Sequence, residues 1–178
     1  STPIKSSAAS DVYKRQEWYD IEGYALDKYV AEQGEFLTNK IKNMIVENPD
    51  IINKQKKDII YVISPFKNVA YQLSKELNKI EFTRYDKKGK PTNIGTVHTF
   101  QGKEAPIVFF VLGADKKCIG AANWAVGTDN PNIMNVAVTR AKEEFYIIGD
   151  KEMYLSLNSD VINDTCKIIE KHNMNTSL

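Results

Sequence analysis

Apolar residues along this chain follow two patterns that alternate from one end to the other. Continuous apolar runs at 59–63 and 107–112 predict buried strands, because such runs suit strands that are covered on both faces. A last strand is expected at 144–148. Two further strands are expected at 18–23 and 94–97, the first as an edge strand ending at a glycine.

Stretches with helical spacing lie between these strands. Residues 31–47 carry an apolar helical stripe that Pro49 ends. Ser64 and Pro65 are the expected N-cap and first residue of a helix that runs to about Lys79. Further helices are predicted at 132–142, 152–157 and 161–171. This alternation predicts an α/β fold, a parallel sheet flanked by helices on both faces.

The ends and one connection do not follow either pattern. Residues 1–16 are rich in Ser, Ala and Lys without a period, and we expect a disordered or cloning-derived leader there. One domain is expected at 17–172, followed by a polar tail at 173–178. The connection 113–131 is longer than usual, which indicates function or mobility. Its Trp124 either covers a hydrophobic face or stacks on a base.

Composition narrows the function. A chain of 178 residues with 42% apolar residues suits one domain with a sizeable core. The net charge of +1 means that any nucleic-acid contact must be local. Four basic residues in the polar segment 81–91 either form a solvated loop or touch nucleic acid: Arg84, Lys87, Lys88 and Lys90.

Neither a metal site nor a membrane segment is expected. The two cysteines, Cys118 and Cys166, are far apart, and the two histidines do not complete a zinc site with them. The sequence contains no long apolar run and no signal peptide, so no membrane partner is expected. These features favour an intracellular, cytoplasmic or nucleoid-associated location.

Arg140 is the first candidate for chemistry. At helical period it shares a stripe with Ile133 and Ala137, which places a permanent charge among apolar residues. A guanidinium in such a place requires an anion, and its planar fork of donors suits a carboxylate or a phosphate. Two interpretations follow: a buried Arg–carboxylate pair, or contact with a phosphate of a ligand.

A second candidate is the junction between the strand at 59–63 and the following helix. The helix start directs backbone N–H groups and the positive end of the helix dipole at the carboxyl edge of the sheet, where α/β folds bind anions. Lys67 and Asn68 stand in the expected first turn, where they can contact a sugar-phosphate backbone. An ordinary capped helix is the alternative.

Three segments together resemble a known family. Thr96-Val-His-Thr-Phe-Gln-Gly-Lys-Glu104 and Asn135-Val-Ala-Val-Thr-Arg-Ala-Lys142 resemble motifs V and VI of superfamily 1 helicases, in that order. Ile60-Tyr-Val-Ile-Ser-Pro-Phe-Lys-Asn68 is similar to the start of the second, C-terminal RecA-like domain in the branch of the nonsense-mediated-decay helicases. Only a short turn precedes the motif V segment, as in the branch of the family that has no inserted subdomain at this point. The resemblance covers about residues 18–150.

The resemblance implies half of an ATP-driven motor on a P-loop NTPase fold. ATP and Mg²⁺ would be bound mainly by the first RecA-like domain, because this sequence has no Walker A phosphate loop. The chain alone is therefore expected to be inactive, as a piece of a longer DNA or RNA helicase. The implied partners are single-stranded DNA or RNA and that first domain, and the branch implies 5′-to-3′ movement.

The resemblance also assigns roles to ten residues. Arg140 is the implied arginine finger, which stabilises charge that develops on the transferred phosphate. Glu104, Gly102 and Gln101 match the nucleotide-binding loop, with Glu104 on the ribose hydroxyls and Gly102 shaping the backbone. The implied nucleic-acid-binding residues are Ser64, Pro65, Phe66, Lys67, Thr96 and His98.

Alternatives stay open at several of these positions. Glu104 can be an exposed surface carboxylate, and His98 can have a structural role. A metal-binding or general-base role for His98 is disfavoured, because no second ligand or nucleophile accompanies it. A non-catalytic nucleic-acid-binding or regulatory module is a second function for the chain. A Rossmann-type small-molecule enzyme is a third, which the missing G-x-G-x-x-G disfavours.

Overall fold

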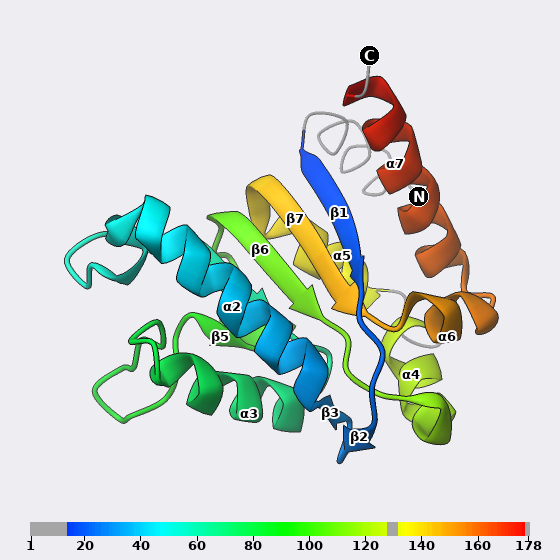
Figure 1. Ribbon diagram of the computed structural model, residues 1–178, viewed down its shortest axis with the longest axis horizontal. Helices are drawn as coiled ribbons and strands as arrows, with labels where there is room; N and C mark the ends of the chain where they lie inside the picture. The colour runs from blue at the N-terminus through cyan, green and yellow to red at the C-terminus, as the bar shows by residue number, and fades with distance from the viewer. Residues whose placement is uncertain (1–13, 128–131, 177–178) are drawn as a thin grey trace.

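A five-stranded parallel sheet lies at the centre of the fold (Figure 1). The computed structural model describes residues 14–127 and 132–176. The strand order is β1-β7-β6-β4-β5, so β1 is the edge strand that the sequence predicted. The strands are β1 (Arg15–Asp20), β4 (Ile60–Ile63), β5 (Ile94–Gly95), β6 (Ala105–Val111) and β7 (Ala141–Gly149). A separate antiparallel hairpin is formed by β2 (Ala25–Leu26) and β3 (Tyr29–Val30).

Helices cover both faces of the sheet. In Figure 1, α2 lies across the near face and α5 lies behind β7 and β6, so the predicted fold class is confirmed. The helices are α2 (Ala31–Glu47), α3 (Lys67–Asn78), α4 (Ile119–Val126), α5 (Asn132–Thr139), α6 (Lys151–Ser156) and α7 (Asp160–Thr176). Three short 3-10 turns are η1 (Pro49–Ile52), η2 (Val97–Phe100) and η3 (Lys116–Cys118).

The central strands form the core. All four residues of β4 are buried, and aromatic rings of β6 and β7 pack in pairs between the layers. Phe109 and Tyr146 have ring centroids 5.2 Å apart, and Phe110 and Phe145 have centroids 6.2 Å apart. In the described part of the chain, helices are too short or too polar to cross a membrane, and no cluster of side chains suits a metal ion.

The predicted start of α3 was wrong by two residues. Helix α3 begins at Lys67, and its N-cap residue is Phe66, without a side-chain cap. The reason lies in the backbone of Ser64, whose N–H donates to the carbonyl of Gly95 at 3.0 Å and thus still belongs to the sheet. The Ser64 hydroxyl accepts the N–H of Phe66 at 3.2 Å, a local turn that precedes the helix instead of capping it.

Three other boundaries differ from the prediction. Strand β1 begins at Arg15 and ends at Asp20, so it does not reach the predicted end at Gly23. Arg15 and Gln16 of the expected leader belong to the sheet, whereas residues 1–13 lie outside the described residues. The strand expected at 94–97 ends at Gly95, where the chain turns into η2. Helix α7 continues to Thr176 and so includes most of the expected polar tail.

The long connection 113–131 contains a helix that the sequence analysis missed. Helix α4 is short and its residues are almost all apolar or small, so it lacks the polar contrast from which a helical period is recognised. The carboxylate of Asp115 caps the preceding turn η3 by accepting the N–H groups of Ala25 at 2.7 Å and Lys117 at 2.9 Å. These hydrogen bonds lower the pKa of Asp115 below its ordinary value. Residues 128–131 of this connection lie outside the described residues.

Candidate functional site

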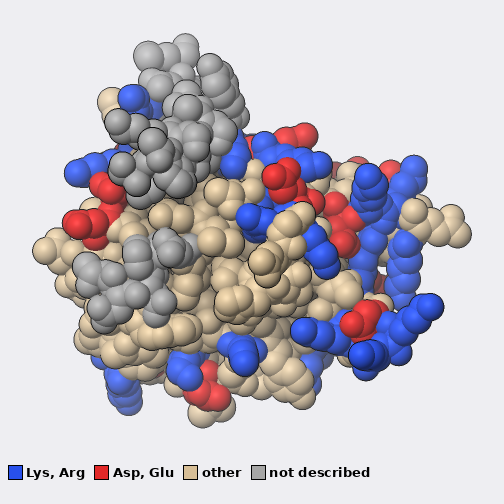
Figure 2. Space-filling view, turned by 180° about the vertical axis from the view of Figure 1, so that it is seen from behind, with Lys and Arg blue, Asp and Glu red and all other residues tan. Residues whose placement is uncertain are grey.

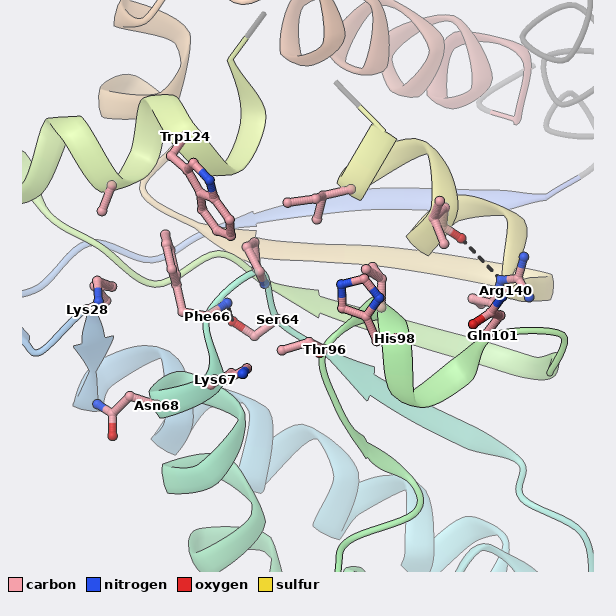
Figure 3. A pocket seen from close by; sticks show the side chains of 15 residues that line it. Lys28, Ser64, Phe66, Lys67, Asn68, Thr96, His98, Gln101, Trp124 and Arg140 are labelled. Carbon is pink, nitrogen blue, oxygen red and sulfur yellow. Dashed lines mark hydrogen bonds between the residues drawn. The ribbon is translucent and has the colours of Figure 1, made fainter. Parts of the chain in front are cut away.

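A groove of about 1140 Å³ joins most of the predicted site residues (Figure 3). Its lining comes from the β2–β3 hairpin, the β4–α3 turn, the segment after β5, and helices α4 and α5. Eight of the ten predicted residues line it: Ser64, Pro65, Phe66, Lys67, Thr96, His98, Gln101 and Arg140. Segments far apart in the sequence therefore meet at one surface.

One end of the groove is formed by the turn between β4 and α3. Ser64 is fully buried, and its hydroxyl is held by the Phe66 N–H. Lys67 is exposed in the first turn of α3 and supplies a positive charge at this end. The side-chain amide of Asn68 is already hydrogen-bonded within the chain: it donates to the carbonyl of Asp27 at 2.8 Å and holds the β2–β3 hairpin against α3.

The segment after β5 lines the groove as well. Thr96 is the N-cap residue of η2, and His98 is exposed and turned into the groove in Figure 3. Gly95 allows the Thr99 side chain to pack against the backbone at the start of this segment, because a Cβ at position 95 would lie 2.3 Å from the hydroxyl of Thr99. Phe100 ends η2 inside the core, fully buried and with its ring centroid 4.5 Å from that of Tyr61. The segment is thus anchored at both ends.

Gln101 and Gly102 form a tight turn directly after η2. Gln101 has φ −56° and ψ 122°, and Gly102 has φ +72°. The N–H of Lys103 donates to the carbonyl of Phe100 at 2.9 Å and closes a type II turn, in which the third residue needs a positive φ. This conformation explains the glycine, as the sequence analysis expected of Gly102.

Arg140 lies between α5 and β7 and contacts this turn. Its Nη1 donates to the carbonyls of Phe100 at 3.2 Å and Lys103 at 3.3 Å. Its other donors reach the carbonyl of Val136 at 3.4 Å and the hydroxyl of Thr139 at 3.3 Å. The described residues place no carboxylate within ion-pair distance of the guanidinium, so the first of the two interpretations, a buried Arg–carboxylate pair, is not found among them.

The predicted helical stripe was partly wrong. Ile133, Val136 and Arg140 share the groove face, at spacings of i, i+3 and i+7, whereas Ala137 is fully buried in the core. The helix ends at Thr139, and Arg140 links it to the sheet: its N–H still donates to the carbonyl of Ala137 at 3.1 Å, while its carbonyl accepts the N–H of Ala105 at 3.0 Å. Arg140 therefore has a backbone fixed by the sheet and a side chain turned to the groove.

Two predicted nucleotide-binding residues lie outside the groove lining. Gly102 and Glu104 are exposed on the approach to β6, next to the lining residue Gln101. Glu104 is three residues from Gln101 along the chain, so it lies near the Arg140 end without facing the cavity itself.

Several lining residues were not assigned to the site by the sequence analysis. Lys28 comes from the β2–β3 turn, where it has φ +68°, and its carbonyl accepts the N–H of Ala114 at 2.7 Å. An Asp-Lys pair is not a typical hairpin signal, so nothing in the sequence marks this turn. Trp124 projects from α4 into the groove, and Ala121 beside it is small and apolar. Only the missed helix α4 brings these two residues here.

The lysine-rich loops lie at a different place from the groove opening. Figure 2 shows Lys and Arg side chains gathered on the side from which the loops 53–58 and 84–91 project. Arg84 joins the two loops by donating to the carbonyls of Lys56 at 2.7 Å and Asn53 at 2.8 Å, and by pairing with Asp58 at 3.2 Å. Arg84 therefore has a structural role, whereas Lys87, Lys88 and Lys90 are exposed.

The fold and the groove define a class of protein: a RecA-like, P-loop NTPase fold of the helicase type, without a Walker A loop in this sequence. The chain belongs to the AAA domain family, whose match covers residues 10–152. It is also similar to Helicase sen1 of the fission yeast Schizosaccharomyces pombe, with 30% identity over 130 residues. That match takes in 71% of this chain and 7% of the relative. A helicase-type domain is thus supported by both comparisons.

Proposed function

We propose that this chain is the C-terminal motor domain of an ATP-dependent superfamily 1 helicase, with Arg140 as its arginine finger. The observation that carries the proposal is the guanidinium itself. It is held only by carbonyl and hydroxyl oxygens among the described residues, so its charge is not neutralised by a carboxylate. A positioned, unneutralised guanidinium at the rim of a groove suits a phosphate.

The nucleotide would meet the Arg140 end of the groove. The residues there fit a triphosphate in their chemistry: a guanidinium, the amide of Gln101, and the nearby carboxylate of Glu104 for ribose hydroxyls. When bound, ATP would supply the phosphoryl group that is transferred to water, and Mg²⁺ would neutralise charge on its phosphates. Arg140 stabilises the charge that develops during that transfer. The first RecA-like domain of a longer protein would hold most of the nucleotide.

The nucleic-acid strand would lie at the other end of the groove. Thr96, His98 and Lys67 present a hydroxyl, an imidazole and an ammonium group, which can donate to phosphate oxygens. Ser64, Pro65 and Phe66 shape the wall beside them. Contacts of this kind grip the backbone of single-stranded DNA or RNA without regard to sequence.

The η2 segment connects the two ends. It begins at Thr96, in the strand-binding part, and ends at Phe100, whose carbonyl holds Arg140 at 3.2 Å. A movement of Arg140 on nucleotide binding would therefore shift the residues that grip the strand. We infer that η2 and the following type II turn couple hydrolysis to movement.

The decisive experiment compares ATP hydrolysis by this chain alone and by a longer protein that carries it together with a first RecA-like domain. We expect no hydrolysis by the chain alone, because no Walker A lysine is present, and strand-stimulated hydrolysis by the longer protein. Poly(dT) and poly(U) as stimulants would identify the strand. Hydrolysis by the chain alone would contradict the proposal, and a longer protein that binds strands without hydrolysis would favour the non-catalytic module.

Replacement of Gly102 by Ala should weaken the motor through the turn. The positive φ is strained for Ala by about 1–2 kcal/mol, and relief of that strain would move the carbonyls that position Arg140. We expect strand-stimulated hydrolysis by the longer protein to fall by about 10- to 100-fold, as for other small misplacements of catalytic groups.

Gly89→Ala is the matched control for this variant. Gly89 has φ +79°, and a Cβ on either glycine would meet no atom within 4 Å, so the two substitutions carry the same backbone strain. Gly89 lies in the loop 84–91, away from the groove, and its replacement should lower thermal stability equally while hydrolysis is retained. An equal loss of activity in both variants would show that Gly102 has no specific role.

A further inference from the structure

Trp124 is exposed where a structural tryptophan would be buried. Its side chain lies on α4 with 48% of its surface accessible, although the indole is the largest apolar group in the groove lining. The other tryptophan, Trp18, is partly buried and donates its indole N–H to the carbonyl of Gly149 at 3.1 Å. Among the described residues, no such hydrogen bond is found for Trp124.

The indole nevertheless packs against an aromatic ring on one side. Its ring centroid lies 5.9 Å from that of Phe66, with 32° between the planes, and Phe66 itself is only 5% exposed. The ammonium of Lys28 lies 5.6 Å from the Phe66 ring on the same end of the groove. Figure 3 shows Trp124 reaching from α4 toward the β4–α3 turn, with Phe66 beside it.

The two walls of this end differ in chemistry. The wall of α4 and α5 is apolar and contains Ala121, Trp124, Ile133 and Val136. The opposite wall carries the polar groups of Lys67, Thr96 and His98. A nucleotide unit has the same division, with a charged phosphate on one side of the sugar and a flat base on the other. Single-stranded nucleic acid is commonly bound by such a pairing of donors with an aromatic platform.

We propose that Trp124 is a stacking platform for one base of the bound strand, with Phe66 as its support. The inference rests on the strand-binding part of the proposed function and adds to it the residue that contacts a base. Stacking on an indole is tolerant of sequence because every base has a π-face, so the platform grips the strand without selecting a base. The polar wall holds the phosphates while the base lies against Trp124.

The experiment uses this chain and three ten-nucleotide probes: oligo(dT), oligo(U) and an abasic strand with the same phosphates. Affinity is measured by fluorescence anisotropy of labelled probes at low salt. Removal of base stacking should weaken binding of the base-bearing strands by about 5- to 100-fold. Trp124→Leu, which retains apolar packing against Phe66, should show this loss, whereas Trp124→Phe should retain most of the affinity. The abasic strand should bind all three proteins equally.

Tryptophan emission gives a second readout. In a Trp18→Phe background the emission reports Trp124 alone, and base-bearing strands should quench it while the abasic strand does not. Lys67→Gln provides the contrast, because loss of a phosphate contact should weaken base-bearing and abasic strands alike.

The outcomes separate this inference from the proposed function. Equal affinity of the wild type and Trp124→Leu for oligo(dT) and oligo(U), without quenching, would overturn the stacking role while strand binding stands. Absence of binding to every probe by the wild type would overturn both the stacking role and the proposed strand site.

Discussion

Replacement of Arg140 by Ala is expected to abolish the proposed strand-stimulated ATP hydrolysis by a longer protein that carries this chain, while nucleotide binding is largely retained. Arginine fingers in other NTPases accelerate hydrolysis by about 10³- to 10⁵-fold, because they act on charge that develops only in the transition state. The loss should therefore fall on kcat. Steady-state ATPase assays with a saturating strand, beside equilibrium binding of a fluorescent ATP analogue, measure the two effects separately.

Two further variants sharpen this prediction. Arg140→Lys should fail nearly as badly as Ala, because one ammonium group cannot maintain the bonds to Phe100 and Lys103 and also offer a planar fork to a phosphate. Lys142→Ala is the matched control, since Lys142 is an exposed cation two residues away whose removal changes the same charge. Full activity of the Arg140→Ala protein would reject the arginine-finger role. An equal loss of activity in Lys142→Ala would show that the effect comes from the loss of one positive charge and not from the position of Arg140.

The second large effect is expected on stability, from Phe100→Ala. The side chain is fully buried against Tyr61, so its truncation removes apolar burial and leaves a cavity, at a cost of about 3–5 kcal/mol. Urea denaturation of this chain, followed by circular dichroism, should show a marked fall in the unfolding midpoint. The variant also loosens η2, whose last carbonyl holds Arg140.

Tyr71→Ala is the control for this substitution. Tyr71 is an aromatic residue of α3 with 57% of its surface exposed, so its removal should change the free energy of unfolding by no more than about 0.5 kcal/mol. Similar midpoints for Phe100→Ala and the wild type would contradict the packing of η2 described above.

The type II turn at Gln101 and Gly102 connects the two segments that resemble motifs V and VI. The first segment supplies the turn, and the second supplies Arg140, which the carbonyls of Phe100 and Lys103 orient. Among the described residues, carbonyl and hydroxyl oxygens hold Arg140, and no carboxylate of the chain neutralises it. Carbonyl dipoles position the guanidinium without cancelling its charge, which leaves it able to act on a ligand.

The apolar pattern of the sequence predicted the order and type of the main elements. Helix α2 has the predicted bounds, and each predicted buried strand is present to within a few residues, because β4 and β6 are continuous apolar runs, β7 contains the apolar run 145–148, and α2 has a clear helical stripe ended by Pro49. Boundaries failed where a long-range contact decided them. Ser64 remains in the sheet because Gly95 pairs with it, a partner that lies far along the chain.

By itself, the sequence therefore determined the α/β fold, the family motifs and eight of the residues that line the groove. Local period and turn chemistry carry that information, and both can be read from neighbouring residues. Only the tertiary structure decided which surface these segments form. Arg140 donates to the carbonyls of Phe100 and Lys103, which are 40 and 37 residues away along the chain. Trp124 reaches Phe66 only because α4 packs beside the β4–α3 turn. No local pattern encodes such contacts, since they depend on how the whole chain closes around the sheet.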